Sequence, residues 1–301
     1  MNSEEVQFVC KGVTCHAVLC SPSKATTNGA GVVIGHGLCG TVDSGLLPYA
    51  EAFAKAGFHA LAFDYRGFGL SEGKKRQYVS APDQLIDWQK AIGFLRRHEH
   101  VDAERIGLWG ISFSGGHVLH LAHMDARIRA VVAQVPMIDP VLSFNVGNYH
   151  RGAEGTAAMT QKVGAHLKRR WFSKDVEMLK VAPDGKPGPA MLGSKEAAIY
   201  PKLAGPSWRN ELHPDSLLFG KIATNNASLL TDDLTTPMLV QMGQNDKVVS
   251  NEAIINFARR CGPLAQFTPY EADHFTMLRQ TKQRKAAMAE ATAFYKRHLI
   301  L

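Results

Sequence analysis

Residues 105–116 read Arg-Ile-Gly-Leu-Trp-Gly-Ile-Ser-Phe-Ser-Gly-Gly, and residues 117–123 continue as His-Val-Leu-His-Leu-Ala-His. An apolar strand pattern therefore passes through a Gly/Ser turn straight into a helix pattern. A turn this tight strains the backbone of its apex residue, and small neighbours let that residue approach the sheet. The apex lies at the helix N-terminus, where the helix dipole and free backbone N–H groups favour negative charge. We interpret Ser112, at the apex, as a nucleophile.

Ser114 is a rival for this role. It stands where the G-x-S-x-G pattern usually has its second glycine, and it too has small residues two positions away on either side. Gly110 ends the strand pattern, which favours Ser112 as the apex. An ordinary strand–turn–helix crossover also needs glycine and tolerates serine. Whether Ser112 is a nucleophile therefore depends on whether the chain also supplies a base and an acid for it.

Strand and helix patterns alternate on both sides of this turn. Apolar or alternating runs predict strands at 6–10, 13–21, 31–35, 59–64, 105–110, 129–135, 237–243 and 265–270. Helix patterns occupy 43–56, 80–98, 117–123, 250–260 and 282–298. Ser80 opens the second of these helices in a capping-box pattern. The alternation predicts an α/β fold with a mostly parallel sheet.

Residues 140–230 break this rhythm. They contain helical patches, a turn-rich stretch at 183–189 and scattered aromatic residues: Phe144, Tyr149, Trp171, Phe172, Tyr200, Trp208 and Phe219. A segment this long between strands indicates a lid or a binding insertion. We therefore expect a core domain of residues 1–139 and 231–301 and a lid of residues 140–230. The aromatic residues either line an apolar pocket or form a small core of the lid.

Composition narrows the class of protein. The chain has 301 residues, of which 45% are hydrophobic, enough for one large domain or a domain with an insertion. No apolar run approaches the roughly 20 residues of a membrane span, and the N-terminal residues lack the layout of a signal peptide. Five cysteines, an odd number, indicate free thiols. We expect a cytoplasmic protein with no membrane partner.

The net charge of +7 is concentrated in the lid region. Residues 141–230 hold 12 Lys and Arg against 7 Asp and Glu, and the densest cluster is Lys168-Arg169-Arg170. A short basic run is more typical of a solvated helix face than of a phosphate-binding tract, and no nucleic-acid motif accompanies it. We expect no nucleic-acid partner. The same positive charge also suits the binding of a small substrate that is anionic or attached to a carrier.

Two glycine-rich turns could supply an oxyanion hole. Residues 36–40, His-Gly-Leu-Cys-Gly, directly follow the strand at 31–35 and precede the candidate nucleophile in the chain. This order is typical of an oxyanion hole built from two loops. We assign one donor to the backbone N–H of Leu38, with Cys39 as the alternative, and the other to Phe113. His36 is interpreted as a structural residue that bonds to its own loop.

Ser112, Asp246 and His274 each lie in a loop at the end of a predicted strand, in that order along the chain. A hydroxyl needs an imidazole to take its proton, and the imidazole needs a carboxylate to fix its tautomer. Asp139, which also ends a strand, is the alternative acid. His117, His120 and His123 lie three residues apart, a spacing that drifts around a helix, and no carboxylate lies near them. We therefore expect no metal at these histidines.

These parts together resemble the α/β-hydrolase fold family over nearly the whole chain. The resemblance rests on residues 36–40, 64–71, 110–116 and 273–275 and on Asp246 after its strand. It implies an eight-stranded, mostly parallel sheet flanked by helices, a mainly helical lid after the sixth strand, a Ser-Asp-His triad and no cofactor. Residues 206–211, Pro-Ser-Trp-Arg-Asn-Glu, look like those of esterase- and thioesterase-like hydrolases and transferases linked to polyketide pathways.

The sequence thus predicts a serine hydrolase that cleaves a small-molecule ester or thioester through an acyl-enzyme. A serine nucleophile argues against epoxide hydrolases and haloalkane dehalogenases. Acyl transfer, cleavage of a carbon–carbon or peptide bond, and a non-catalytic ligand-binding relative stay open as alternatives. A homo-oligomer also stays open, and the sequence does not identify the acyl group or its length.

Overall fold

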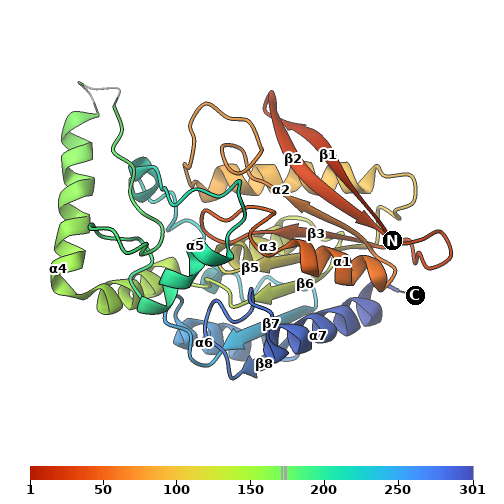
Figure 1. The fold of residues 1–301 in the computed structure, drawn as a ribbon. Helices are drawn as coiled ribbons and strands as arrows, with labels where there is room; N and C mark the ends of the chain where they lie inside the picture. The colour runs from red at the N-terminus through yellow and green to blue at the C-terminus, as the bar shows by residue number, and fades with distance from the viewer. Residues whose placement is uncertain (171, 173–174, 301) are drawn as a thin grey trace.

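The computed structural model describes residues 1–170, 172 and 175–300. These residues form one sheet of eight strands (Figure 1). The strands are β1 (Asn2–Cys10), β2 (Val13–Ser21), β3 (Gly31–Gly35), β4 (His59–Phe63), β5 (Ile106–Ile111), β6 (Ile128–Gln134), β7 (Met238–Gly243) and β8 (Ala265–Tyr270). Trp171, one of the predicted lid aromatics, lies outside the described residues.

The strand order is β1-β2-β4-β3-β5-β6-β7-β8. β1 pairs antiparallel with β2, and β2 pairs antiparallel with β4, whereas every pair from β4 to β8 is parallel. The predicted eight-stranded, mostly parallel α/β sheet is confirmed. Because β3 to β8 run in the same direction, the loops at their carboxyl ends meet at one edge of the sheet.

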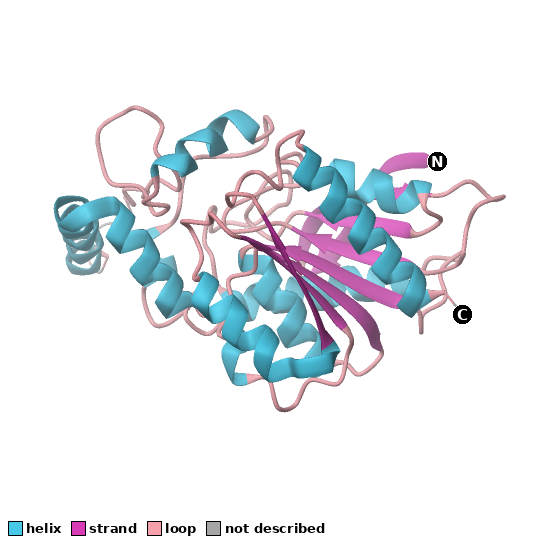
Figure 2. Cartoon of the chain, turned by 90° about the horizontal axis from the view of Figure 1, so that it is seen from below, coloured by secondary structure: helices cyan, strands magenta, loops and turns pink. Residues whose placement is uncertain are grey.

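Helices cover both faces of the sheet, as Figure 2 shows from below. α1 (Leu47–Lys55) and α7 (Lys282–Leu299) pack on one face, and α2 (Ala81–Arg96), α3 (Phe113–Met124) and α6 (Asn251–Cys261) pack on the other. Side chains of β3 alternate between the two cores, with Val33 in one and Val32 and Ile34 in the other. A strand buried on both faces reads as a continuous apolar run for this reason.

The chain between β6 and β7 carries α4 (Pro140–Arg169), α5 (Tyr200–Leu203) and three short 3₁₀ helices, η1 (Lys195–Ile199), η2 (Pro214–Leu217) and η3 (Ala227–Leu229). We call residues 140–230 the insertion. Gly152 interrupts α4 with φ 77° and ψ 170°, so α4 is two helical pieces joined at a kink. Figure 1 shows α4 standing at the side of the molecule away from both termini.

The insertion shares its core with the α2/α3/α6 face of the sheet. Buried side chains such as Leu179, Leu192 and Leu212 belong to the same apolar cluster as Val33 and Leu108. Phe144 and Trp208 pack against this cluster, whereas Tyr149, Phe172 and Phe219 are exposed. The aromatic residues of the insertion therefore do not form a separate small core within the described part of the chain.

Three local predictions were wrong. β1 begins at Asn2, because residues 2–5 extend the antiparallel hairpin with β2 at the exposed edge, where no apolar alternation is required. α1 begins at Leu47 rather than at residue 43, because Asp43 instead accepts hydrogen bonds from Thr41 in its own loop and from Ser207. Ser80 makes no side-chain capping bond to α2, where Pro82 occupies the first turn and offers no N–H.

Within the described residues, no helix is both long and apolar enough to cross a membrane.

Candidate active site

Ser112 lies at the apex of the turn between β5 and α3. Its backbone has φ 57° and ψ −117°, the strained conformation expected from the sequence. The turn is fixed to the end of β6, since Ser112 N–H donates to the Gln134 carbonyl at 2.9 Å and Met137 N–H donates to the Ser112 carbonyl at 2.8 Å. A Cβ atom at Gly110 would lie 2.2 Å from the Ser114 carbonyl oxygen, so only glycine fits there.

The structure brings Ser112, His274 and Asp246 together. His274 Nε2 lies 3.0 Å from Ser112 Oγ, and His274 Nδ1 lies 2.6 Å from Asp246 Oδ2. The His274 side chain is 6% exposed and the Asp246 side chain is fully buried. The second oxygen of Asp246 accepts hydrogen bonds from Val248 N–H at 2.8 Å and Val249 N–H at 3.1 Å. The carboxylate is therefore fixed with one oxygen facing the imidazole.

This geometry favours transfer of a proton from Ser112 Oγ to His274 Nε2. A hydrogen bond from Nδ1–H of His274 to the carboxylate leaves Nε2 free to accept the proton of the Ser112 hydroxyl. The buried carboxylate would stabilise the imidazolium that forms when His274 takes this proton. The three side chains can thus support nucleophilic attack by Ser112 on a carbonyl group.

Asp139, the alternative acid, is engaged elsewhere. It is the N-cap residue of α4, and its Oδ1 accepts hydrogen bonds from Val141 N–H at 2.8 Å and Leu142 N–H at 3.0 Å. Its other oxygen accepts from Asn226 Nδ2 at 3.2 Å. Helix capping accounts for Asp139 without a catalytic role.

The 36–40 loop lies against the nucleophile. A Cβ atom at Gly37 would lie 2.9 Å from Ser112 Cβ, so the absence of a side chain lets the loop approach. His36 Nδ1 donates to the Gly37 carbonyl at 3.0 Å, the bond to its own loop that we expected. Among the described residues, neither Leu38 N–H nor Phe113 N–H has a hydrogen-bond partner. Both groups are therefore available to an oxyanion.

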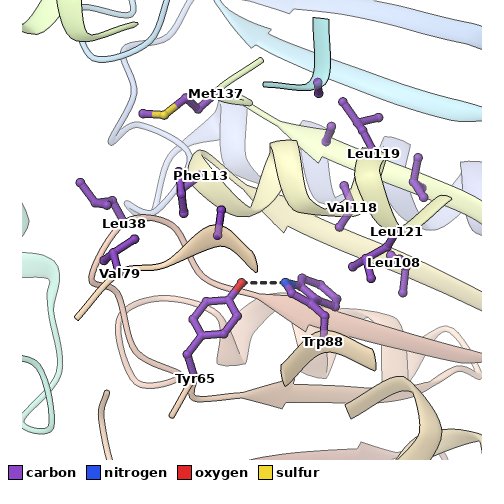
Figure 3. Close-up of a cluster of buried hydrophobic side chains, with 14 of the residues drawn as sticks. Leu38, Tyr65, Val79, Trp88, Leu108, Phe113, Val118, Leu119, Leu121 and Met137 are labelled. Atoms are coloured by element: carbon purple, nitrogen blue, oxygen red, sulfur yellow. Dashed lines mark hydrogen bonds between the residues drawn. The ribbon is translucent and has the colours of Figure 1, made fainter. Parts of the chain in front are cut away.

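Ser114 is fully buried beneath this loop. Its hydroxyl donates to the His36 carbonyl at 2.5 Å and accepts from the Tyr65 hydroxyl at 2.5 Å. Trp88 Nε1 in turn donates to the Tyr65 hydroxyl at 2.7 Å, and Figure 3 shows the indole pointing at that oxygen. The hydroxyl that departs from the G-x-S-x-G pattern thus joins α3 to the 36–40 loop.

Ser112 and His274 line a small cavity of about 30 Å³, which we call the reaction cavity. Most of its wall is apolar and comes from Leu38, Leu46, Ile111, Met137, Leu192, Tyr200, Val248, Phe275 and Leu278. Leu192 and Tyr200 belong to the insertion, so the insertion supplies part of the wall. Tyr200 packs on Phe275, the neighbour of His274, with ring centroids 5.5 Å apart.

Two polar contacts hold the insertion at this site, and the sequence gives no signal for either. Ser207 N–H and Oγ donate to Asp43 at 2.9 and 2.8 Å. Lys247, beside Asp246, pairs with Glu196 at 2.8 Å. Both pairs join residues far apart in the chain, so they depend on how the insertion packs on the core.

The remaining candidates lie away from the reaction cavity. In α3, His117 is buried and His120 is half-buried, and burial lowers the pKa of both imidazoles. Across residues 1–170, 172 and 175–300, no three His, Cys, Asp or Glu side chains are placed to share a metal ion. Lys168 and Arg169 end α4, and Arg169 pairs with Glu177 at 3.5 Å.

Comparisons with known proteins agree with this architecture. The family model described as "Serine aminopeptidase, S33" matches residues 26–273. The quorum-quenching protein AidA of Acinetobacter baumannii is 42% identical over 135 residues, 45% of this chain and 44% of that protein. Thiohydrolase aneE of Aspergillus aculeatus is 40% identical over 113 residues, 37% of this chain and 35% of that protein. The matched stretches thus span less than half of these relatives.

A solved structure extends the likeness to the whole fold. The crystal structure of the α/β hydrolase GrgF from a Penicillium species superposes with a TM-score of 0.81 over all of both chains, at 19% identity. At this identity the match speaks for the fold alone. Because the family model covers most of the sequence and the eight-stranded sheet agrees with it, this chain belongs to the serine aminopeptidase family of α/β hydrolases.

Proposed function

We propose that this protein is a serine hydrolase that cleaves an ester or thioester of an apolar acyl group. Ser112 attacks the carbonyl carbon, His274 takes the hydroxyl proton and returns it to the leaving group, and Asp246 holds His274. In the second half-reaction, His274 takes a proton from a water molecule, which attacks the acyl carbon, and then returns the proton to Ser112 Oγ as the acid leaves. The observation that carries the proposal is the 3.0 Å contact of Ser112 Oγ with an imidazole already held by a buried carboxylate.

The backbone N–H groups of Leu38 and Phe113 are the proposed oxyanion donors. Leu38 precedes the nucleophile by two crossover units and Phe113 directly follows it, and neither N–H has a hydrogen-bond partner among the described residues. Such donors stabilise the charge that develops on the carbonyl oxygen, typically by about 3–4 kcal/mol for each donor. We propose in addition that the insertion acts as a lid, since Leu192 and Tyr200 wall the reaction cavity.

The cavity chemistry favours an acyl ester or thioester over a peptide. An aminopeptidase binds the charged amino terminus of its substrate, which calls for a carboxylate in the site. No Asp or Glu is among the described residues of the cavity wall. An apolar acyl group fits the wall without leaving a charge unpaired. The similarity to a thiohydrolase and, at 30% identity over 115 residues, to the polyketide transferase grgF supports the thioester as the first substrate class to test.

The test is turnover of paired oxygen esters and thioesters that carry the same acyl group. The products are analysed for free acid and for acyl transfer to an added alcohol. We expect free acid from the wild type and a loss of at least about 10³-fold in kcat for Ser112→Ala. Ser80→Ala is the matched control, because Ser80 is equally buried but lies outside the cavity.

Acyl-alcohol as the dominant product would replace hydrolysis by acyl transfer with the same triad. Full turnover in Ser112→Ala would refute the proposed nucleophile. No turnover of any ester or thioester by the folded wild type would refute the proposed function.

A further inference from the structure

An open groove with a volume of about 440 Å³ lies where the 74–76 loop of the core meets two segments of the insertion. We call it the basic groove. Its described wall consists of Lys74, Lys75, Arg76, Val176, Met178, Arg209, Glu211 and His213. None of these residues lines the reaction cavity, so the proposed triad leaves the charges of the groove unexplained.

Backbone hydrogen bonds fix the segments that form the basic groove. Leu179 and Leu212 exchange N–H···O bonds of 2.9 and 2.8 Å, which join the two segments of the insertion to each other. His213 N–H donates to the Gln77 carbonyl at 2.7 Å, which ties the insertion to the end of the 74–76 loop. The fold of the backbone therefore brings these charged side chains together.

The wall of the basic groove carries more positive than negative charge. Lys75 pairs with Asp215 at 2.6 Å, and Arg209 lies 3.8 Å from Glu211. Lys74 is exposed and forms no ion pair with any residue that the structure describes. One positive charge of the wall is thus left without a counter-charge.

Arg76 adds a second positive charge, and its guanidinium is held in place. Its two terminal nitrogens donate to the carbonyl oxygens of Ser71 and, at 2.8 Å, of Gly69. Within the described part of the chain it forms no ion pair. Burial and the charge of Arg209 lower the pKa of Arg76, so the two guanidinium groups repel each other. An anion between them would remove this repulsion and would meet a donor that is already ordered.

We propose that the basic groove binds a phosphate group of a small molecule. A phosphate monoester carries about 1.5–2 negative charges at neutral pH, which matches the two uncompensated positive charges of the wall. The guanidinium groups of Arg76 and Arg209 donate in a planar fork that fits phosphate oxygens. Val176 and Met178 give the groove an apolar side, where charges attract each other more strongly than in bulk water. The proposal does not depend on the activity of Ser112.

Calorimetric titration with inorganic phosphate at low ionic strength tests the site. Arg209→Gln and Lys74→Gln should each weaken phosphate binding by about fivefold, because each removes an exposed positive charge from the wall. Glu211→Gln should tighten binding by a similar factor, because the Glu211 carboxylate competes with phosphate for Arg209. These three variants leave Arg76, which supports the 69–71 backbone, unchanged.

Two control variants make the same charge changes on helices that do not line the groove. Arg297→Gln in α7 and Lys55→Gln in α1 replace exposed side chains and should bind phosphate as the wild type does. Equal weakening in these controls would mean that net charge alone attracts phosphate, which would overturn the proposal. Unchanged affinity in all three groove variants, or no phosphate binding by the wild type, would also overturn it.

Turnover identifies the molecule that carries the phosphate. If it is the thiol of a thioester substrate, acetyl-coenzyme A should have a lower KM than an acetyl thioester of a thiol without phosphate. Arg209→Gln should then raise the first KM and leave the second KM and both kcat values unchanged. Equal KM values in the wild type, together with phosphate binding, would assign the groove to a separate phosphorylated ligand. If no thioester is hydrolysed, the proposed function fails and the titration still decides the phosphate site.

Discussion

Asp246 and Asp139 both follow strands of the sheet, yet they contact different groups. Asp246 faces His274 at 2.6 Å, whereas Asp139 caps α4 through two backbone N–H groups. We expect Asp246→Asn to lower kcat by about 10⁴-fold with the fold intact, because the amide no longer stabilises the imidazolium or the productive tautomer. The measurement is kcat on the best ester or thioester.

Asp139→Asn is the matched control for this change. Asparagine caps a helix about as well as aspartate, so kcat should stay close to wild type. Stability should fall slightly, because an amide NH₂ replaces the Asp139 oxygen that accepts from Asn226 Nδ2. An equal loss of kcat in the two variants would remove Asp246 from its assigned role.

Ser114 is predicted to act on stability rather than on chemistry. Ser114→Ala leaves the His36 carbonyl without its buried donor, which costs about 1–3 kcal/mol of unfolding free energy. Urea unfolding measures this loss. Tyr65 keeps its bond from Trp88 and should remain in place. An unchanged unfolding free energy would show that the bond from Ser114 to the 36–40 loop contributes nothing.

At the residue scale, the sequence reveals what lies at strand ends and misses what depends on packing. Ser112, Asp246 and His274 could be chosen because each directly follows a strand pattern, and parallel strands bring such loops to one edge. The bond between Tyr65 and Ser114 joins two buried hydroxyls 49 residues apart. Nothing in the local sequence of either residue identifies the other.

At the scale of elements, two of the four glycines of helix α4 differ in backbone conformation. Gly152 has φ 77° and ψ 170°, a conformation that residues with a side chain rarely adopt, whereas Gly164 lies in regular helix. Gly152→Ala should lower the unfolding free energy by about 1–3 kcal/mol, because the kink is strained for alanine. Gly164→Ala should raise it by about 0.5–1 kcal/mol, since alanine favours helix.

Urea unfolding of the two α4 variants provides the comparison. The opposite signs make each variant the control for the other. Stabilisation by Gly152→Ala would mean that α4 is straight in solution.

The helix pattern in the sequence predicts the existence of helices such as α1 and α4 well. Their ends are harder to predict, as α1 shows, because Asp43 leaves the expected helix to hold Ser207 of the insertion.

At the scale of the whole molecule, Asp215 joins the insertion to the core. Its carboxylate contacts Lys75 of the core at 2.6 Å and His166 of α4 at 2.8 Å. Burial works against ionisation of Asp215, but the hydrogen bonds from Lys75 and His166 outweigh it and lower its pKa from 3.8 to about 2. A carboxyl group with a lowered pKa stabilises the fold above pH 3.8, and this contribution is lost as the pH falls toward 2.

Asp215→Asn should therefore flatten the decline of unfolding free energy between pH 3.8 and about 2, as measured by urea unfolding. Glu211→Gln is the control, because Glu211 forms an exposed ion pair with Arg209. This variant should keep the wild-type pH profile of the unfolding free energy. Burial and the charge of Lys75 lower the pKa of His213 to about 4, and the charge of Asp215 opposes this shift, so the decline above pH 3.8 is compared only between the wild type and Glu211→Gln. A wild-type decline in Asp215→Asn would contradict the account of this contact.

The succession of strands and helices along the chain and the meeting of three strand-end loops could be predicted from the sequence, because they follow from periodicity and from the direction of parallel strands. The path of the insertion over the core could not be predicted from the sequence. Its contacts, such as Asp43 with Ser207 and Lys247 with Glu196, join loops that no periodic pattern relates. The shape of the reaction cavity depends on these contacts, so the acyl group can be argued only from the folded molecule.

The most direct test of the central claim is the intact mass of the protein after reaction with a fluorophosphonate probe. The account predicts one adduct on the wild type, no adduct on Ser112→Ala and one adduct on Ser114→Ala, because Ser112 contacts the His274 imidazole whereas Ser114 bonds to His36 and Tyr65. Loss of the adduct only in Ser114→Ala, or its persistence in Ser112→Ala, would contradict the assignment of Ser112 as the nucleophile.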